Sequence, residues 1–169
     1  YYGYDGDTIN VYLPDSKSDQ YVVSYVEEKL KSPSLFDVSK LSAKNKYEVF
    51  MRGNHPLVKI KTAARNQKSL LVIKDSYANC FIPFLTAHFS RITVVDPRYY
   101  YEDLYELIDS EDISHVLYLY NANTFYSDTS LELALMPQSS TDSTPDSIET
   151  DNTDTASASS DNASADNPE

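Results

Sequence analysis

The chain has 169 residues, a length that suits one domain of modest size, and its formal net charge is −12 at pH 7. Eight of the 26 acidic residues, but no Lys or Arg, lie in residues 137–169, so the net charge of residues 1–136 is −4. The sequence has no basic patch of the kind that binds nucleic acid, and no run of about 18 apolar residues that would span a membrane.

Composition divides the chain into two parts. Residues 1–136 carry nearly all of the aromatic and large apolar residues, and we predict that they fold as an α/β domain. Residues 137–169 are mostly Ser, Thr, Asp, Asn, Ala and Pro, and we predict a disordered acidic tail because they cannot bury enough apolar surface to offset the entropy of ordering. The chain begins with neither Met nor a signal peptide, so we expect a fragment that lacks its upstream part.

In the first half of the chain, the residue pattern predicts mostly extended structure. Alternating and β-rich runs predict strands at 8–13 and 21–26, which we expect to form a hairpin, and a third strand at 57–62. Residues 34–41 are expected to be irregular or to form one helical turn. Gly53-Asn54-His55-Pro56 predicts a turn, since Gly supplies an unusual φ and Pro keeps His55 out of the helical region.

From residue 70 onward the pattern changes to alternating strands and helices. Apolar runs predict buried strands, and helical spacing predicts the segments between them. We predict strands at 70–73, 92–95 and 115–120, helices at 78–89 and 100–108, a loop at 121–128 and a short helix at 129–135. This order predicts a three-layer α/β fold with a parallel sheet, to which the earlier strands add antiparallel neighbours.

Ligands of parallel sheets bind at the carboxyl ends of the strands, and three polar residues follow the strands there. Ser76 comes where a buried strand meets a helix, and it is either a nucleophile or the N-cap of that helix. Asp75 either assists it or caps the same helix. Arg98 either binds an anionic group or orients a substrate, or it pairs with Asp96 or Asp75. Asn121 is the third polar residue at this edge.

A serine hydroxyl needs a base within hydrogen-bond reach, and the chain has only three histidines. His88 is expected at the far end of the helix that follows Ser76, and His115 at the opposite edge of the sheet. Only His55 is a candidate auxiliary residue, and its alternative role is to hold its own turn by hydrogen bonds. No metal-ligand spacing and no phosphate-binding glycine loop occur, so we expect no metal and no cofactor. The one cysteine, Cys80, is expected to be a buried structural thiol.

Four blocks of sequence resemble a known family. They are Val-Phe-Met-Arg-Gly-Asn-His-Pro-Leu at 49–57, Lys-Asp-Ser-Tyr-Ala-Asn-Cys at 74–80, Val-Val-Asp-Pro-Arg-Tyr-Tyr at 94–100, and residues 118–131 with Tyr-Asn-Ala-Asn-Thr-Phe. In this order and at this spacing they resemble the C-terminal part of DHHW-family bacterial proteins. That family is similar to the permuted SGNH-hydrolase-like enzymes that O-acetylate bacterial exopolysaccharides.

The resemblance implies an SGNH- or flavodoxin-like sheet and a serine enzyme of the cell envelope, outside the cytoplasm or at the cell surface. It implies that Ser76 is the nucleophile, and that Asn121 corresponds to the oxyanion-hole asparagine of the wider superfamily. The family's acid and histidine come from an upstream Asp-His motif, whereas this chain has no Asp-His-His-Trp and no Trp.

Three hypotheses follow for function. The first is part of an O-acetyltransferase or esterase that acts on cell-envelope carbohydrate, with backbone N–H groups after Ser76 and the side chain of Asn121 holding the oxyanion. The expected partners are a carbohydrate polymer or an acyl-donor protein. The second is a non-catalytic carbohydrate-binding or scaffold domain on the same fold. The third is a truncated reading frame with no function of its own.

Overall fold

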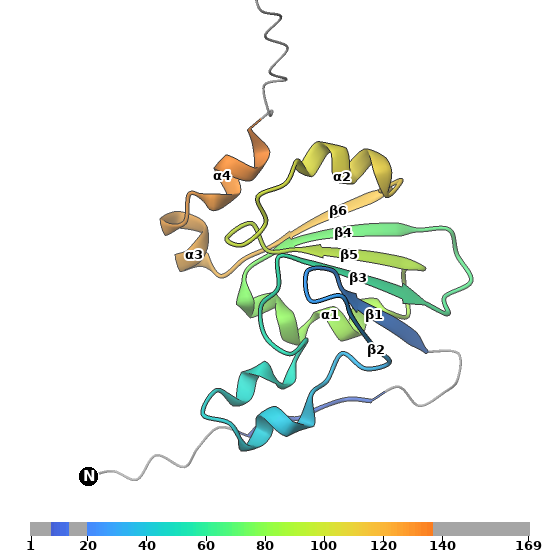
Figure 1. Cartoon of the computed structure of the whole chain (residues 1–169), viewed down its shortest axis with the longest axis vertical. Coiled ribbons are helices and arrows are strands. Elements are labelled where there is room, and N and C mark those ends of the chain that lie inside the picture. The colour runs from blue at the N-terminus through green and yellow to red at the C-terminus, as the bar shows by residue number, and fades with distance from the viewer. Residues whose placement is uncertain (1–7, 14–19, 137–169) are drawn as a thin grey trace, which may run out of the picture. The chain divides into compact units, whose positions relative to one another are not determined.

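The computed structural model describes residues 8–13 and 20–136 (Figure 1), and the predicted tail at 137–169 lies outside the described residues. The described part is a mixed α/β unit around a six-stranded sheet with strand order β2-β1-β3-β5-β4-β6. The prediction of an α/β fold is therefore confirmed. The strands are β1 (Tyr21–Tyr25), β2 (Leu30–Ser32), β3 (Leu57–Thr62), β4 (Ser69–Lys74), β5 (Arg91–Val95) and β6 (His115–Leu119).

The parallel half of the sheet is the part that positions the site. Strand β4 pairs in parallel with β5 on one side and with β6 on the other. All six residues of β4 are buried, as a continuous apolar run predicts for a central parallel strand. The predicted succession of parallel strands after residue 70 is confirmed.

Residues on alternate positions of β4 face two separate parts of the core. Leu70 and Val72 belong to one buried cluster together with Ile82 of helix α1 (Ile82–Leu85). Leu71 and Ile73 belong to the other cluster, which includes residues of helices α2 (Leu104–Ser110) and α4 (Ser130–Leu135). Because side chains of a strand alternate between faces, α1 covers one face of the sheet and α2 with α4 cover the other (Figure 1).

The chain thus leaves the carboxyl ends of β4 and β5 toward opposite faces. After β4 it passes through the 3₁₀ turn η4 (Ser76–Cys80) to α1, and after β5 it passes to α2. Because β5 and β6 flank β4 on opposite sides, the chain order reverses at β4, and the adjoining carboxyl ends of β4 and β6 form a topological switch point, the place where open α/β sheets bind ligands.

In the antiparallel half, the predicted strands at 21–26 and 57–62 occur as β1 and β3, but the predicted hairpin with residues 8–13 does not form. Strand β1 lies between β3 and β2, and it is antiparallel to both. Its hairpin partner is therefore β2 and not residues 8–13, which form no strand. The predicted strand at 8–13 is wrong because both edges of β1 are already occupied. Tyr12 instead lies against Phe84, with ring centroids 6.1 Å apart.

The helical segments are shorter than predicted, with one addition. The predicted helix at 78–89 is divided into η4 and α1, because Pro83 has no N–H with which to continue a helix from the preceding turn. Residues 121–128, predicted as a loop, contain helix α3 (Ala122–Ser127), capped by Asn121. Short 3₁₀ turns η2 (Val38–Ser42) and η3 (Lys46–Val49) precede β3. None of the helices in the described ranges has the length and apolar character needed to cross a bilayer.

The burial of β4 gives a first prediction. Leu71 is 0% exposed between the strands and α2, whereas Leu133 of α4 is 61% exposed. We expect Leu71→Ala to lower the free energy of unfolding by about 2–5 kcal/mol, because it removes buried atoms and leaves a cavity. The matched control Leu133→Ala should change it by no more than about 0.5 kcal/mol. Urea denaturation followed by circular dichroism measures both, and equal losses would contradict this account of the core.

Candidate active site

Ser76 is the first residue of η4, directly after β4 and Asp75. The N-cap of this turn is Asp75, whose side chain accepts a hydrogen bond from the backbone N–H of Tyr77 at 2.9 Å. The alternative that Ser76 is the helix cap is therefore wrong. Ser76 is half-buried, and its hydroxyl makes no hydrogen bond within residues 8–13 and 20–136. The side chain is thus free to take part in chemistry at the switch point.

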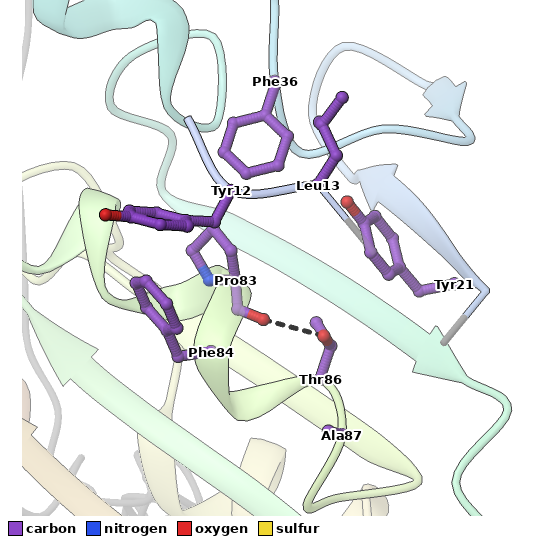
Figure 2. Close-up of a pocket in the computed structure, with 8 residues that line it drawn as sticks. All are labelled: Tyr12, Leu13, Tyr21, Phe36, Pro83, Phe84, Thr86 and Ala87. Carbon is purple, nitrogen blue, oxygen red and sulfur yellow. Dashed lines mark hydrogen bonds between the residues drawn. The ribbon is translucent and has the colours of Figure 1, made fainter. Parts of the chain in front are cut away.

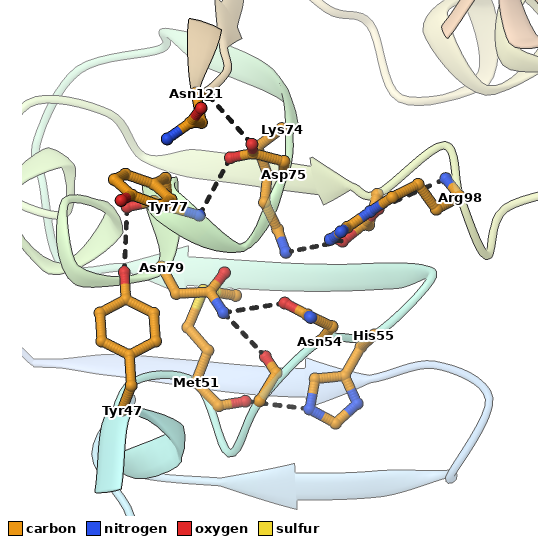
Figure 3. A network of polar contacts seen from close by, with 12 residues as sticks. Tyr47, Met51, Asn54, His55, Lys74, Asp75, Tyr77, Asn79, Arg98 and Asn121 are labelled. Atoms are coloured by element: carbon orange, nitrogen blue, oxygen red, sulfur yellow. Dashed lines mark hydrogen bonds and ion pairs between the residues drawn. The ribbon is translucent and has the colours of Figure 1, made fainter. Parts of the chain in front are cut away.

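Asp75 connects the ends of two strands. Its side chain is 1% exposed, and its second carboxylate oxygen accepts a hydrogen bond from the backbone N–H of Asn121 at 3.0 Å (Figure 3). Since Asn121 follows β6, the carboxylate joins η4 (Ser76–Cys80, the serine turn) to the carboxyl end of that strand. Of the two roles considered for Asp75, capping is the one that the geometry supports.

Asn121 lies at the predicted edge and caps α3. Its side-chain oxygen accepts a hydrogen bond from the backbone N–H of Asn123 at 2.7 Å. The amide nitrogen of Asn121 makes no hydrogen bond to any described residue, so its two N–H groups remain available. Ser76 and Asn121 are therefore brought to one edge of the sheet, as the sequence predicts, with Asp75 between them.

Arg98 forms an ion pair with Asp96, which is one of the two alternatives for its role. Its guanidinium donates from Nε at 2.8 Å and from Nη2 at 2.7 Å to the two carboxylate oxygens of Asp96. This bidentate hydrogen bonding raises the pKa of Arg98 and keeps it charged. The Arg98 side chain is still 27% exposed, so it also presents positive charge toward solvent near the end of β5.

Lys74 is a charged residue that the sequence analysis did not assign to the site. Its ammonium group lies 3.3 Å from Asp96 Oδ2, and the two side chains are 1% and 0% exposed. Burial lowers the pKa of Lys74, and the attraction of Asp96 only partly opposes this effect. The sequence contains a signal that could have revealed this cluster. A Lys ends one apolar strand, and Asp-Pro-Arg follows the next strand.

His55 is occupied by structural contacts. Its Nδ1 lies 2.5 Å from a carboxylate oxygen of Glu28, its Nε2 lies 2.9 Å from the carbonyl oxygen of Met51, and its ring lies tilted against the ring of Tyr25. Both neighbouring atoms are acceptors, so neither ring nitrogen is free to accept a proton from Ser76. His55 therefore serves its own turn rather than catalysis.

The other two histidines lie away from the serine turn. His88 follows α1, where its backbone N–H donates to Leu85. His115 begins β6, at the end of the strand opposite Asn121, and contacts Ser114 and the ring of Phe89. No histidine of the described residues is thus placed as a general base for Ser76. Nor do residues 8–13 and 20–136 bring together three His, Cys, Asp or Glu side chains that could hold a metal ion.

Two further residues, missed in the sequence analysis, fix the serine turn from the side of β3. Asn79 is 1% exposed, and its amide nitrogen donates to the carbonyl oxygen of Gly53 and to Asn54 Oδ1, both at 3.1 Å (Figure 3). The hydroxyl of Tyr47 donates to the carbonyl oxygen of Tyr77 at 3.0 Å and accepts from the N–H of Cys80 at 3.3 Å. The serine turn is therefore tethered at both ends.

An aromatic groove lies beyond the C-terminal end of the serine turn, and it encloses about 210 Å³. Tyr12 and Phe84 form one part of its wall and Phe36 another (Figure 2). An adjoining hollow shares these three rings and also includes Cys80. Cys80 is partly exposed rather than buried as predicted, because it ends η4 at the edge of this hollow. The adjoining hollow thus reaches the last residue of η4, the turn that Ser76 begins.

Comparison with known proteins identifies the family. The family model described as DHHW protein matches residues 3–95, more than half of the chain. The chain belongs to the DHHW family. No curated protein sequence matches it. The predicted family resemblance is therefore confirmed, and the DHHW match includes Ser76, Asp75 and the turn with His55, whereas Arg98 and Asn121 follow it in the chain.

Solved structures agree with this assignment. A DHHW family protein from Eubacterium siraeum is 27% identical with a TM-score of 0.62, over 70% of this chain and 41% of that chain. Structures of Bacillus cereus PatB1, one of them with a sulfonyl adduct, are 26% and 25% identical with a TM-score of 0.52 each, over 62% of this chain and 36% of those chains. The chain thus spans about two fifths of the length of these proteins.

The charge cluster gives a second prediction. Asp96→Asn would leave Lys74 buried without a compensating negative charge, and we expect a loss of about 3–5 kcal/mol in the free energy of unfolding. Lys74→Met should cost less than half as much, because Asp96 keeps its bidentate partner Arg98. Chemical denaturation of the two variants beside wild type measures the difference. A Lys74→Met variant as unstable as Asp96→Asn would show that the lysine, and not the aspartate, holds the cluster together.

Proposed function

We propose that this chain forms part of an SGNH-like acyl-ester enzyme, an O-acetyltransferase or esterase, that acts on cell-envelope carbohydrate outside the cytoplasm. The observation that carries the proposal is the placement of Ser76. It opens a tethered turn at the switch point of the sheet, within the DHHW match, and its hydroxyl is free of hydrogen bonds to the described residues. Helices against both faces of the sheet support a three-layer SGNH-like arrangement.

In this mechanism the Ser76 hydroxyl attacks the carbonyl carbon of an acyl ester while a base takes its proton. The bond between the acyl carbon and the donor oxygen breaks, the donor leaves with a proton, and the acyl group stays on Ser76. A sugar hydroxyl then takes the acyl group in a transferase, or water takes it in an esterase. Sulfonyl reagents modify activated nucleophiles, and the sulfonyl adduct of PatB1 is in keeping with such a group in that similar protein.

The described residues do not supply the base that this mechanism needs. Both nitrogens of His55 are occupied, and His88 and His115 lie elsewhere. We propose that the base is the histidine of the Asp-His motif that the family resemblance implies, with the full-length protein as the active form. The carboxylate of Asp75 is already committed to two backbone N–H groups, so it is not proposed as the acid that orients this histidine.

The alternative function is a non-catalytic carbohydrate-binding or scaffold domain on the same fold. Two observations favour it: no described histidine faces Ser76, and an aromatic groove with exposed Tyr12 and Phe84 lies beside the serine turn. Exposed aromatic faces offer apolar surfaces on which sugar rings can stack. Under this alternative, the protein would bind an envelope glycan saturably without releasing acetate, and Phe84→Ala would weaken binding while Ser76→Ala would not. Isothermal titration with purified peptidoglycan fragments or exopolysaccharide measures the binding affinity of wild type and of both variants.

The enzyme proposal makes a third prediction. Fluorophosphonate probes label only activated serines, so the full-length protein should be labelled, and Ser76→Ala should abolish labelling. A matched control is Ser110→Ala, which removes a hydroxyl at the C-terminal end of α2, far along the chain from the serine turn. This control should label as wild type does.

The outcome also separates the two functions. Labelling that survives Ser76→Ala would place the reactive residue elsewhere and overturn the assignment of Ser76. A full-length protein that is folded by circular dichroism but is not labelled would count against the enzyme and favour the binding domain.

A further inference from the structure

The serine turn provides fewer oxyanion donors than its backbone suggests. An oxyanion hole needs N–H groups that point at the developing negative charge on the acyl oxygen. The N–H of Tyr77 donates to the Asp75 side chain, and the N–H of Ala78 donates to the Asp75 carbonyl oxygen at 3.3 Å. The predicted use of backbone N–H groups after Ser76 is therefore wrong for these two. The N–H of Ser76 itself and the side-chain amide of Asn121 remain.

A second asparagine reaches the serine turn from the loop before β3. Asn54 follows three residues with positive φ, Met51 at 55°, Arg52 at 61° and Gly53 at 109°, so the chain reverses sharply there. The side-chain oxygen of Asn54 accepts the hydrogen bond from Asn79. Its amide nitrogen makes no hydrogen bond to another residue of the described ranges, and the residue is exposed. Asn54 is thus anchored at its oxygen and free at its nitrogen.

The geometry of a 3₁₀ turn places this amide on the side of Ser76. In such a turn, side chains three residues apart are eclipsed, with a rise of about 2.0 Å per residue. Ser76 and Asn79 are three residues apart in η4, so their side chains point to the same side, about 6 Å apart along the axis. Asn79 meets Gly53 and Asn54 on that side. On 3₁₀ geometry we therefore expect the Ser76 side chain on the side of η4 that meets the loop of Asn54.

The orientation of the two carboxamides follows from their partners. Asn79 lies between two acceptors, the Gly53 carbonyl oxygen and Asn54 Oδ1, so its nitrogen must point at them. This donor in turn requires the oxygen of Asn54 to face Asn79, so the nitrogen of the exposed Asn54 side chain points away from Asn79. Asn79 is thus a positioning residue for Asn54.

We infer that the side-chain N–H of Asn54 donates a hydrogen bond to the acyl oxygen of a substrate on Ser76. Asn54 and Asn121 then flank the serine turn as two donors, each with its oxygen fixed by the protein. This inference rests on the proposed function, since it assigns a substrate contact at the same serine. It also gives the Gly-Asn-His-Pro loop a role: Gly53 makes the turn, His55 holds it, and Asn54 acts at the site.

The test compares Asn54→Asp with Asn54→Ala in the full-length protein. An aspartate keeps an oxygen for the hydrogen bond from Asn79 but cannot donate to an oxyanion. For hydrolysis of 4-nitrophenyl acetate we expect both variants to lower kcat about 10²–10³-fold, the typical effect of losing one oxyanion donor, with KM nearly unchanged. The rate of fluorophosphonate labelling should fall as well, because the phosphonyl oxygen occupies the same position.

Two controls separate this role from a structural one. Asn123→Asp adds the same charge on α3, near the site but on an exposed side chain, and should keep wild-type kcat. The melting temperature of Asn54→Asp should match wild type, since Asn54 is exposed and the contact with Asn79 is kept. If Asn54 were only structural, Asn54→Asp would retain activity and labelling while Asn54→Ala lost them, and this result would overturn the inference.

Failure of the proposed serine enzyme can be distinguished from failure of the role inferred for Asn54. If Ser76→Ala keeps wild-type hydrolysis and labelling, or if wild type shows neither, the proposed function fails and the role of Asn54 fails with it. If Ser76→Ala abolishes both and Asn54→Asp leaves both unchanged, the serine enzyme stands and only the oxyanion assignment of Asn54 is wrong.

Discussion

The buried carboxylate of Asp75 is the interaction on which the candidate site depends. Its two oxygens accept hydrogen bonds from the backbone of the serine turn and from the backbone after β6, so two strand ends share one acceptor. Asp75 is 1% exposed, and burial of a carboxyl group is costly unless hydrogen-bond donors satisfy its oxygens. Because both oxygens are used in this way, the acid that follows β4 serves the geometry of the site and is not free to orient a base.

The same edge of the sheet also contains a cluster of buried charges. Lys74 ends β4, and Asp96 follows β5, so their side chains meet because the two strands are parallel neighbours. Arg98 completes the charge balance around Asp96 from the more exposed side. Such a cluster contributes little net stability, since desolvation opposes the attraction, but the removal of Asp96 would leave the buried charge of Lys74 unpaired. The ends of β4 and β5 are therefore held in a fixed relation close to Ser76.

The parallel half of the fold and the antiparallel strands β1 and β3 were predictable, whereas the hairpin partner of β1 was not, for a physical reason. Leu70 to Ile73, Ile92 to Val95 and His115 to Leu119 form strands as predicted, because continuous apolar runs in this order allow few other arrangements. Alternation at 8–13 is a weaker signal, since a strand also needs a free edge and β1 offers none. In the site, Ser76 and Asn121 were predictable from their positions at strand ends. Asn79 and Asn54 were not, because their roles come from a contact between distant segments.

The tethers of the serine turn explain how the proposed nucleophile, Ser76, is ordered without the base that would activate it. Asp75 fixes the start of the turn, Asn79 fixes its buried side, and Tyr47 fixes its end, and all three contacts come from residues of this chain. Activation by a base is a separate requirement, since a serine hydroxyl at neutral pH is a weak nucleophile however well it is placed. A histidine brought to this edge would therefore meet a serine whose backbone conformation is already set, and the cost of ordering the nucleophile is met by folding rather than at the moment of reaction.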